Sequence, residues 1–379
     1  MSVAGGGSHR RVVQVVVALV VVFVSLAFPS TSLADTGGES ERKERLARAM
    51  AEGGRALDLT VHSSSMNRDV PIRVLVAADT SVPRPTLYLL NGSGGGEGGD
   101  AHWFAQTDLV DFAADKNVNI VVPMSGGYSY YTDWAKVDPV LGRNKWTTFL
   151  TRELPPVIDA KLNANGGVNG IAGISMAGTS VLALAETAPD LYRGGVASYS
   201  GCAETNTELG RLAVGAVVGG SGGDIANIWG PIGGPGWRAH DPVVNAYKLR
   251  GKAIYVSSGT GLPGRHDQLS DEAIDGDVVE YARILGLGGV IEAATYYCTL
   301  NLQSRLQGAP HPGDVRLRTR DPFLAVLGGP ARQVLADARA RAESLTGPVA
   351  AWTPDRRTDL HDESRDCDPP VHRARSAAP

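Results

Sequence analysis

The chain has 379 residues, a hydrophobic share of 43%, and 36 basic against 40 acidic residues, for a formal net charge of −4. This length is enough to bury the core of one large domain or of two small ones. The near balance of charge argues against nucleic acid or an anionic membrane surface as a partner.

The N-terminus has the pattern of a secretory signal. Basic residues 9–11 precede an apolar run over 12–28, and the small residues Ser32 and Ala34 follow at the spacing that a signal peptidase recognises. The alternative is an uncleaved anchor, because the run is close to the lower length limit for spanning a membrane. We expect cleavage after Ala34 and a secreted or cell-envelope protein that makes no integral membrane contact.

Apolar runs typical of strands alternate with segments typical of helices. The expected strands are residues 56–63, 70–77, 86–90, 118–123, 167–173, 194–198 and 253–257. The expected helices are residues 39–54, 104–116, 146–163 and 179–188. This alternation, with strands apolar on both faces, predicts an α/β fold with a mostly parallel central sheet flanked by helices.

A nucleophile is expected directly after the strand at 167–173. Gly173-x-Ser175-x-Ala177 lies between an apolar strand and a helix, which is the context of a nucleophile elbow. The turn pushes the serine hydroxyl out at the sheet edge, and small neighbours avoid collisions. The amide of Met176 would then face an oxyanion. The alternative is a serine in an ordinary strand–helix turn.

A second oxyanion donor is expected from the loop after strand 86–90. This loop begins at Asn91 and is rich in glycine, which lets backbone amides approach a reacting carbonyl. The amide of Ser93 is the candidate. The alternative is a flexible surface loop without a role in binding.

The three cysteines have neither zinc-site spacing nor a C-x-x-C motif. In an exported protein we expect one disulfide between Cys202 and Cys298, with Cys367 left over; the alternative is three free thiols. The histidines and carboxylates also lack ligand spacing. We therefore expect no metal and no organic cofactor.

Several segments resemble, in the same order, the antigen 85 mycolyltransferases and the wider group of exported esterases around them. They lie within residues 59–306 and comprise residues 87–92, 128–134, 145–155, 173–178, 228–231 and 241–242. The resemblance implies an α/β-hydrolase-fold enzyme that transfers mycoloyl or similar acyl groups to trehalose through an acyl-serine. It implies an acyl-lipid or ester substrate, with trehalose mycolates among the candidates.

The resemblance also implies roles for single residues. Ser175 matches the nucleophile, and Ser93 and Met176 match the two amides of the oxyanion hole. The family's acid, a Glu on a helix, matches Glu292. Without the family, Asp267 in the loop after strand 253–257 is the other candidate acid.

The expected disulfide favours Glu292 over Asp267. The wider esterase group pairs two cysteines placed like Cys202 and Cys298, and this bond would hold the helix of Glu292 beside the serine loop.

Substrate contacts are implied at Asn91, Trp134 and Trp229. At two positions the chain departs from the family: Asn91 replaces an acidic residue, and Gly94 replaces an arginine. Each missing charge-assisted hydrogen bond would weaken sugar binding by ~1.5–3 kcal/mol.

The family's histidine lies in a Thr-His-Ser-Trp motif, which this chain lacks; residues 320–330 stand in its place. A DNA sequence that encodes the family's Gly-Thr-His-Ser-Trp-Arg-Tyr-Trp-Glu-Asp-Gln also encodes residues 321–330 when it is read out of register. We interpret this as a reading-frame shift between residues 308 and 320. The alternative is a diverged tail that uses another histidine, and the candidates are His102, His240, His266 and His311.

The expected organisation is a signal over 1–34, an α/β-hydrolase domain over 35–315 and an atypical tail over 316–379. The tail is rich in Arg, Ala, Asp and Pro, could form one helix over 333–345, and has a disordered composition from residue 348. Two functions remain open: a serine acyltransferase or esterase, and a catalytically impaired relative that serves as an envelope binding or structural protein.

Overall fold

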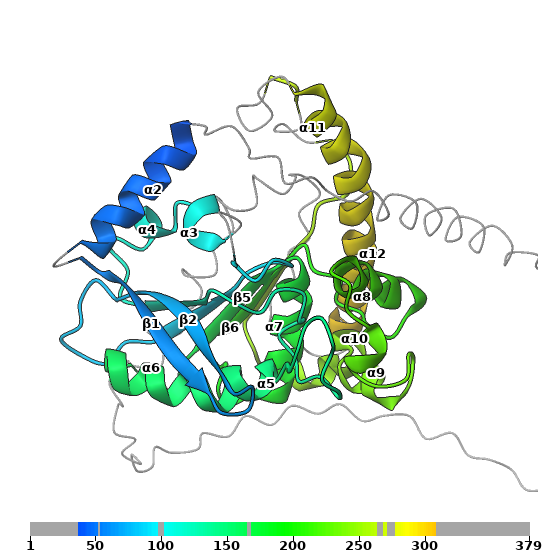
Figure 1. Ribbon diagram of the computed structural model, residues 1–379, viewed down its shortest axis with the longest axis horizontal. Coiled ribbons are helices and arrows are strands. Elements are labelled where there is room, and N and C mark those ends of the chain that lie inside the picture. The colour runs from blue at the N-terminus through cyan, green and yellow to red at the C-terminus, as the bar shows by residue number, and fades with distance from the viewer. Residues whose placement is uncertain are drawn as a thin grey trace, which may run out of the picture. The chain divides into compact units, whose positions relative to one another are not determined.

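The computed structural model describes residues 37–51, 54–97, 102–164, 168–263, 268–270 and 277–307. Within them a sheet has the strand order β1-β2-β4-β3-β5-β6-β7 (Figure 1). The strands are β1 (Ala56–Ser63), β2 (Arg68–Leu75), β3 (Thr86–Leu90), β4 (Asn119–Pro123), β5 (Gly170–Ile174), β6 (Gly195–Tyr199) and β7 (Ile254–Ser257). β2 pairs antiparallel with β1 and β4, and all the other pairs are parallel.

Helices cover both faces of this sheet (Figure 1). One face carries α2 (Gly37–Met50), α3 (Trp103–Gln106) and α4 (Leu109–Phe112). The other carries α5 (Trp146–Thr148), η1 (Phe149–Glu153), α6 (Leu154–Leu162) and α7 (Met176–Thr187). The remaining elements are α8 (Glu208–Gly220), η2 (Ile225–Asn227), α9 (Pro235–Ala239), α10 (Pro242–Asn245), η3 (Ala246–Leu249), α11 (Val278–Arg283), η4 (Ile284–Gly288) and α12 (Gly289–Gln307).

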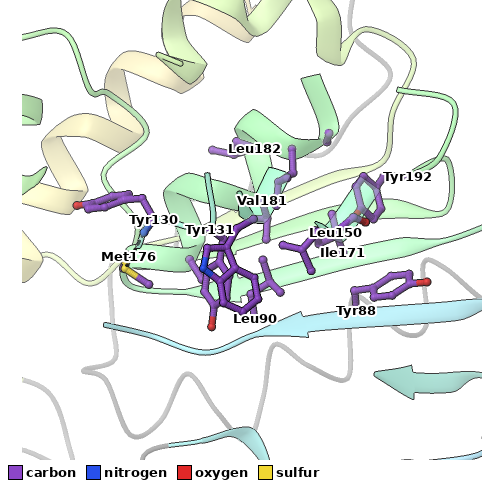
Figure 2. Packing of buried hydrophobic residues seen from close by; sticks show 14 of the residues in the cluster. Tyr88, Leu90, Tyr130, Tyr131, Leu150, Ile171, Met176, Val181, Leu182 and Tyr192 are labelled. Atoms are coloured by element: carbon purple, nitrogen blue, oxygen red, sulfur yellow. Dashed lines mark hydrogen bonds between the residues drawn. The ribbon is translucent and has the colours of Figure 1, made fainter. Parts of the chain in front are cut away.

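The central strands are buried on both faces because each side of the sheet has its own hydrophobic core. In β3, Tyr88 and Leu90 point into the core beside α7, whereas Leu87 and Leu89 point into the core beside α3. Figure 2 shows the first of these cores, where Tyr88 and Leu90 lie with Ile171, Val181 and Tyr192. The predicted mostly parallel α/β sheet is therefore confirmed.

Strands β1 and β3 have the predicted bounds, and β2 begins and ends two residues earlier than expected. The single helix predicted over residues 104–116 is wrong, because the chain forms α3 and α4 there. Thr107 separates the two helices: its backbone is extended, and its hydroxyl donates to the Trp103 carbonyl at 2.5 Å. A side chain that bonds its own helix in this way competes with continuation of the helix.

The helix predicted over residues 146–163 is present, but it contains the π-helical segment η1. Pro155 and Pro156 follow η1 and have no N–H to donate to the carbonyls of Thr151 and Arg152. The amide of Leu154 donates to the Phe149 carbonyl, five residues earlier. The wider turn therefore comes just before a double proline.

The chain divides into two compact units, 1–345 and 346–379, and the second lies wholly outside the described residues. The predicted signal, the 333–345 helix, Cys367 and the atypical tail also lie outside them, so these stay predictions. In the described part of the chain, no helix combines the length and the apolar character needed to cross a membrane.

Candidate active site

The five parallel strands end at one edge of the sheet, where open α/β sheets bind their ligands. Ser93 follows β3, Ser175 follows β5, and Ser200 follows β6. Gly259 lies just beyond the end of β7. The predicted nucleophile and the loops around it are thus brought together at this edge by strand order alone.

Ser175 occupies a sharp turn between β5 and α7, with φ 56° and ψ −121°. A non-glycine residue with positive φ is strained, and its neighbours must hold it in place. Its amide donates to the Tyr199 carbonyl at 2.8 Å, and its carbonyl accepts from the Gly178 amide at 2.9 Å. A Cβ on Gly173 would lie 2.6 Å from the Ala177 carbonyl oxygen. This explains the glycine two residues before the serine, as a nucleophile elbow requires.

The two predicted oxyanion amides lie on loops next to this turn. Met176 is the first residue of α7, so its amide belongs to the helix end whose N–H groups lack intrahelical partners. A Cβ on Gly92 would lie 3.7 Å from the Ser175 Cβ, which places the Ser93 loop beside the serine. Among the described residues the Ser93 amide has no acceptor, while its carbonyl accepts from Tyr128 at 2.7 Å. The oxyanion role of both amides stays a prediction.

Asn91 holds the glycine loop in place. Its side chain is buried, its Nδ2 donates to the carbonyls of Gly95 (3.2 Å) and Pro123 (3.0 Å), and its Oδ1 accepts from the Trp103 amide (3.2 Å). The substrate contact predicted for Asn91 stays a prediction, and the described contacts give the side chain a positioning task. At Gly94, by contrast, an added Cβ would meet no atom within 4 Å.

The glycine loop also interlocks with the loop after β4, a feature that no sequence pattern predicted. Glu97 accepts hydrogen bonds from the Ser125 hydroxyl at 2.6 Å and from the Gly126 amide at 2.8 Å. A Cβ on Gly95 would lie only 2.3 Å from the Gly127 nitrogen. The only hint of this contact in the sequence was an acidic residue, Glu97, within a run of glycines.

Trp134 and Trp229, the other predicted substrate contacts, are buried. The Trp134 indole donates to the Ser129 carbonyl at 2.9 Å, and the Trp229 indole donates to the Thr132 hydroxyl at 3.1 Å. The Trp229 ring also stacks on His240, with 5.1 Å between ring centroids. Both rings pack in the core, and the substrate contact predicted for each stays a prediction.

Glu292, the favoured acid, lies in the first turn of α12 and is 9% exposed. Its Oε2 accepts from the Gly259 amide at 2.6 Å and from the Ser200 hydroxyl at 3.3 Å. Both donors follow strand ends, so the carboxylate lies at the same sheet edge as Ser175. Asp267, the other candidate acid, lies outside the described residues.

The predicted disulfide is present between Cys202 and Cys298, with 5.0 Å between the Cα atoms. Cys202 belongs to the loop after β6, and Cys298 lies on α12 with Glu292. The bond therefore joins the helix of the candidate acid to the loop that packs against α7.

Two of the candidate bases lie in the described part of the chain. His102 Nδ1 accepts from the Ala105 amide at 3.3 Å, so the neutral ring carries its proton on Nε2 and cannot accept another there. His240 Nδ1 lies 2.8 Å from the Gly236 carbonyl, so it carries the proton. Burial lowers the pKa of His240. The remaining candidates, His266 and His311, lie outside the described residues.

His240 also lines a small cavity beside α7. Ser175 does not belong to the lining, to which α7 contributes Thr179, Ser180, Ala183, Leu184 and Thr187. The described residues contain no cluster of three or more metal-ligating side chains.

Comparison with known proteins places the chain in a family. Residues 63–280, more than half of the chain, match the family model of the Esterase family. The chain belongs to the Esterase family.

Its curated relatives include antigen 85 proteins, as the motifs predicted. Ag85A of Mycobacterium leprae, a diacylglycerol acyltransferase/mycolyltransferase, is 32% identical over 213 residues, which are 54% of this chain and 62% of the relative. Ag85B of the same organism is 31% identical over 215 residues, 54% of this chain and 63% of the relative. The chain thus spans about three fifths of the length of these relatives.

Solved structures confirm the α/β-hydrolase fold. MPT51 (FbpC1) of Mycobacterium tuberculosis superposes with a TM-score of 0.57 at 25% identity, covering 75% of this chain and 98% of that one. An S-formylglutathione hydrolase of Agrobacterium tumefaciens gives a TM-score of 0.52 at 14% identity, covering 75% and 94%. Because its sequence identity is low, the second similarity supports the fold only.

Proposed function

We propose that this chain is an exported serine acyltransferase or esterase that works through an acyl-serine intermediate. The observation that carries the proposal is the strained turn at Ser175, which presents a serine at the carboxyl edge of a parallel sheet and at the first turn of a helix. Strain of this kind persists only where surrounding structure enforces it, and it concentrates at functional sites.

The chemistry is that of a serine nucleophile. The Ser175 oxygen attacks an ester carbonyl and gives its proton to a base, and the amides of Ser93 and Met176 hold the oxyanion. Collapse breaks the bond to the leaving alcohol, which takes that proton. A second alcohol, or water, then attacks the acyl-serine and gives its proton to the base, the bond to the Ser175 oxygen breaks, and that oxygen takes the proton back as the product leaves. Glu292 would orient the base, and no histidine is assigned to that role.

Similarity to the antigen 85 proteins supports an acyl-lipid or ester as substrate, trehalose mycolates among them. The open space at Gly94 and the buried amide of Asn91 leave the loop without the two charged groups expected for trehalose. We therefore propose that the acceptor differs from trehalose or that water replaces it. Export rests on the basic and apolar pattern of residues 9–34.

Labelling with a fluorophosphonate probe tests the nucleophile. An activated serine oxygen bonds to phosphorus, and fluoride leaves with the serine proton. Peptide mapping should place the adduct on Ser175, and Ser175→Ala should lose both the adduct and p-nitrophenyl ester turnover while keeping the melting temperature. Labelling of another serine, or turnover that survives in Ser175→Ala, would reject this assignment.

A second candidate function is a catalytically impaired envelope protein that keeps the fold. The observation in its favour is the segment at residues 320–330, which replaces the family's histidine motif. Loss of a triad member removes about four to six powers of ten in rate. Under this alternative Ser175 stays unlabelled in the chain as written. If the missing motif is the cause, restoring the other reading frame after codons 308–320 should recover labelling.

A further inference from the structure

The loop after β6 connects the candidate nucleophile and the candidate acid through consecutive residues. We define residues 199–204 as the coupling segment. It runs between the start of α7, which follows Ser175, and α12, which carries Glu292. Its contacts alternate between these two helices along the chain.

Three contacts join the coupling segment to the start of α7. The Tyr199 carbonyl accepts from the Ser175 amide at 2.8 Å. A Cβ on Gly201 would lie 2.6 Å from the backbone of Gly178, so the two backbones touch. The Cys202 carbonyl accepts from the Thr179 hydroxyl at 2.7 Å. These contacts hold the turn at Ser175 and the start of α7 against the coupling segment.

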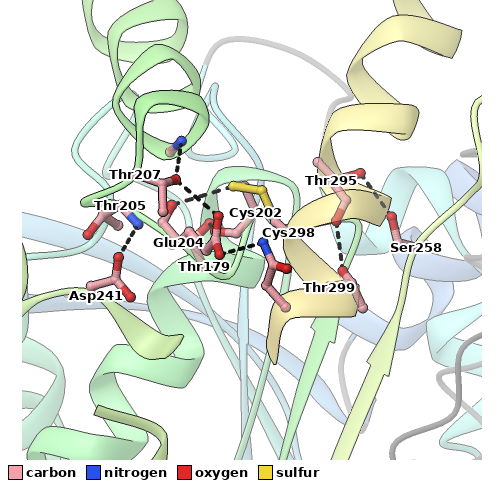
Figure 3. Close-up of a disulfide and its surroundings, with 12 residues drawn as sticks. Thr179, Cys202, Glu204, Thr205, Thr207, Asp241, Ser258, Thr295, Cys298 and Thr299 are labelled. Carbon is pink, nitrogen blue, oxygen red and sulfur yellow. Dashed lines mark hydrogen bonds between the residues drawn. A yellow bond between two sulfur atoms is a disulfide. The ribbon is translucent and has the colours of Figure 1, made fainter. Parts of the chain in front are cut away.

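Three other contacts join the same segment to α12. The Ser200 hydroxyl donates to Glu292, Cys202 is bonded to Cys298, and Glu204 accepts from the Asn301 amide at 2.7 Å. Figure 3 shows the disulfide between the loop and α12, with Glu204 beside it. Cys298 lies six residues beyond Glu292, or ~9 Å along the helix axis, so it fixes the helix without touching the carboxylate.

Ser200 contacts the Glu292 carboxylate directly, and its own backbone is held in a strained conformation. It is buried, it has φ 48°, and its amide donates to the Ser257 carbonyl at 2.7 Å. A serine with positive φ is strained, whereas glycine adopts this backbone conformation readily. What glycine lacks is the hydroxyl that reaches Glu292 Oε2.

We propose that Ser200 is a positioning residue for the Glu292 carboxylate, and that the Cys202–Cys298 disulfide keeps this contact in register with Ser175. The inference rests on the proposed function, because it gives Glu292 a role in activating the nucleophile. On this proposal the strained backbone at Ser200 serves activity and does not aid folding. Relieving the strain and removing the hydroxyl should therefore lower reactivity and raise stability.

The test compares fluorophosphonate labelling rate, kcat and KM for p-nitrophenyl acetate, and melting temperature across four variants of the full chain. Ser200→Gly removes the hydroxyl and relieves the strain, while Ser200→Ala removes the hydroxyl alone. The pair Cys202→Ala and Cys298→Ala, made together, removes the disulfide. Ser304→Ala is the control, since within the described part of the chain this α12 hydroxyl donates only to the Leu300 carbonyl.

Ser200→Gly and Ser200→Ala should each slow labelling and kcat about tenfold with unchanged KM, the effect of one lost hydrogen bond to a charged group. The glycine variant should melt no lower than wild type. The cysteine pair should also be slower, and Ser304→Ala should match wild type. If wild type labels at Ser175 and both Ser200 variants label equally fast, the inference is wrong and the proposed function stands. An unlabelled wild type overturns both.

Discussion

Glu186 gives the chain a pH dependence of stability that its sequence alone does not suggest. This residue lies in the last turn of α7, is 5% exposed, and its Oε1 has no hydrogen-bond partner among the described residues. Burial raises the pKa of Glu186 from 4.5 to about 9, the nearby Lys248 opposes this rise, and Asp241 adds to it. Near neutral pH the folded protein therefore keeps this carboxyl protonated, whereas the unfolded chain ionises it.

The sign comes from proton linkage. Because the folded pKa is raised, the folded state binds the proton more tightly, so stability falls as pH rises above the unfolded pKa and levels off above the folded pKa. The slope is ~1.4 kcal/mol per pH unit, or ~2.5 kcal/mol between about pH 5 and about pH 7. Up to neutral pH this loss depends on the unfolded pKa alone, provided that the folded pKa of Glu186 stays above 7.

Glu186→Gln is the matched variant, because it keeps the shape of the side chain and removes the titration. Urea unfolding of both proteins at several pH values measures the difference, from which the other titrating groups cancel. The variant should gain on wild type by ~1.4 kcal/mol for each pH unit between about 5 and about 8. A difference that does not change with pH would refute the reasoning, since it would mean that Glu186 ionises in the folded state as it does in the unfolded chain.

Three other predictions concern packing, charge and the disulfide. Gly173→Ala should destabilise the fold by ~3 kcal/mol or more, whereas Gly94→Ala, which enters open space, should stay within ~0.5 kcal/mol; equal urea midpoints would contradict this. Burial opposes ionisation of Asp138, but the hydrogen bonds that it accepts outweigh burial and lower its pKa to about 2. Asp138→Asn should therefore cost ~2 kcal/mol near neutral pH, a cost that shrinks as pH falls from about 4 to about 2 and that a pH-independent difference would refute. Unreduced peptide maps should show Cys202 joined to Cys298, and breaking this 96-residue loop should cost ~4 kcal/mol in urea melts; free thiols would contradict it.

The parts of the site that depend on local pattern could be predicted from the sequence. The bounds of β1 and β3 agree with apolar runs, and the turn at Ser175 agrees with small residues at fixed spacing. Local signals failed where a side chain redirects the backbone. Thr107 divides the predicted 104–116 helix, and the double proline after Glu153 widens the turn before it.

Residues whose task depends on tertiary neighbours carried no such signal. Ser200 is an ordinary serine in the sequence, and only the packing of α12 against the loop after β6 places it beside Glu292. Glu97 and Glu186 are likewise acidic residues whose surroundings come from distant segments. Buried polar groups of this kind are found by asking what each one bonds to, because neither their type nor their spacing identifies them.

The catalytic base differs from these residues. The family resemblance predicts where a histidine should lie, but the chain does not supply a histidine there. The nucleophile and both amides come from strand ends, and the candidate acid from α12, all within residues 56–307, where the chain agrees with the fold of its relatives. A single shift of frame after residue 308 would leave all of these residues intact and replace only the C-terminal part of the chain. This is the pattern seen: the motifs match in order up to residue 306, and residues 320–330 stand where the histidine motif belongs. A gradually diverged tail would not be expected to be encoded by the family's own codons in another register. Sequencing codons 308–320 decides between the two, because one inserted or deleted base must appear there if the frame has shifted.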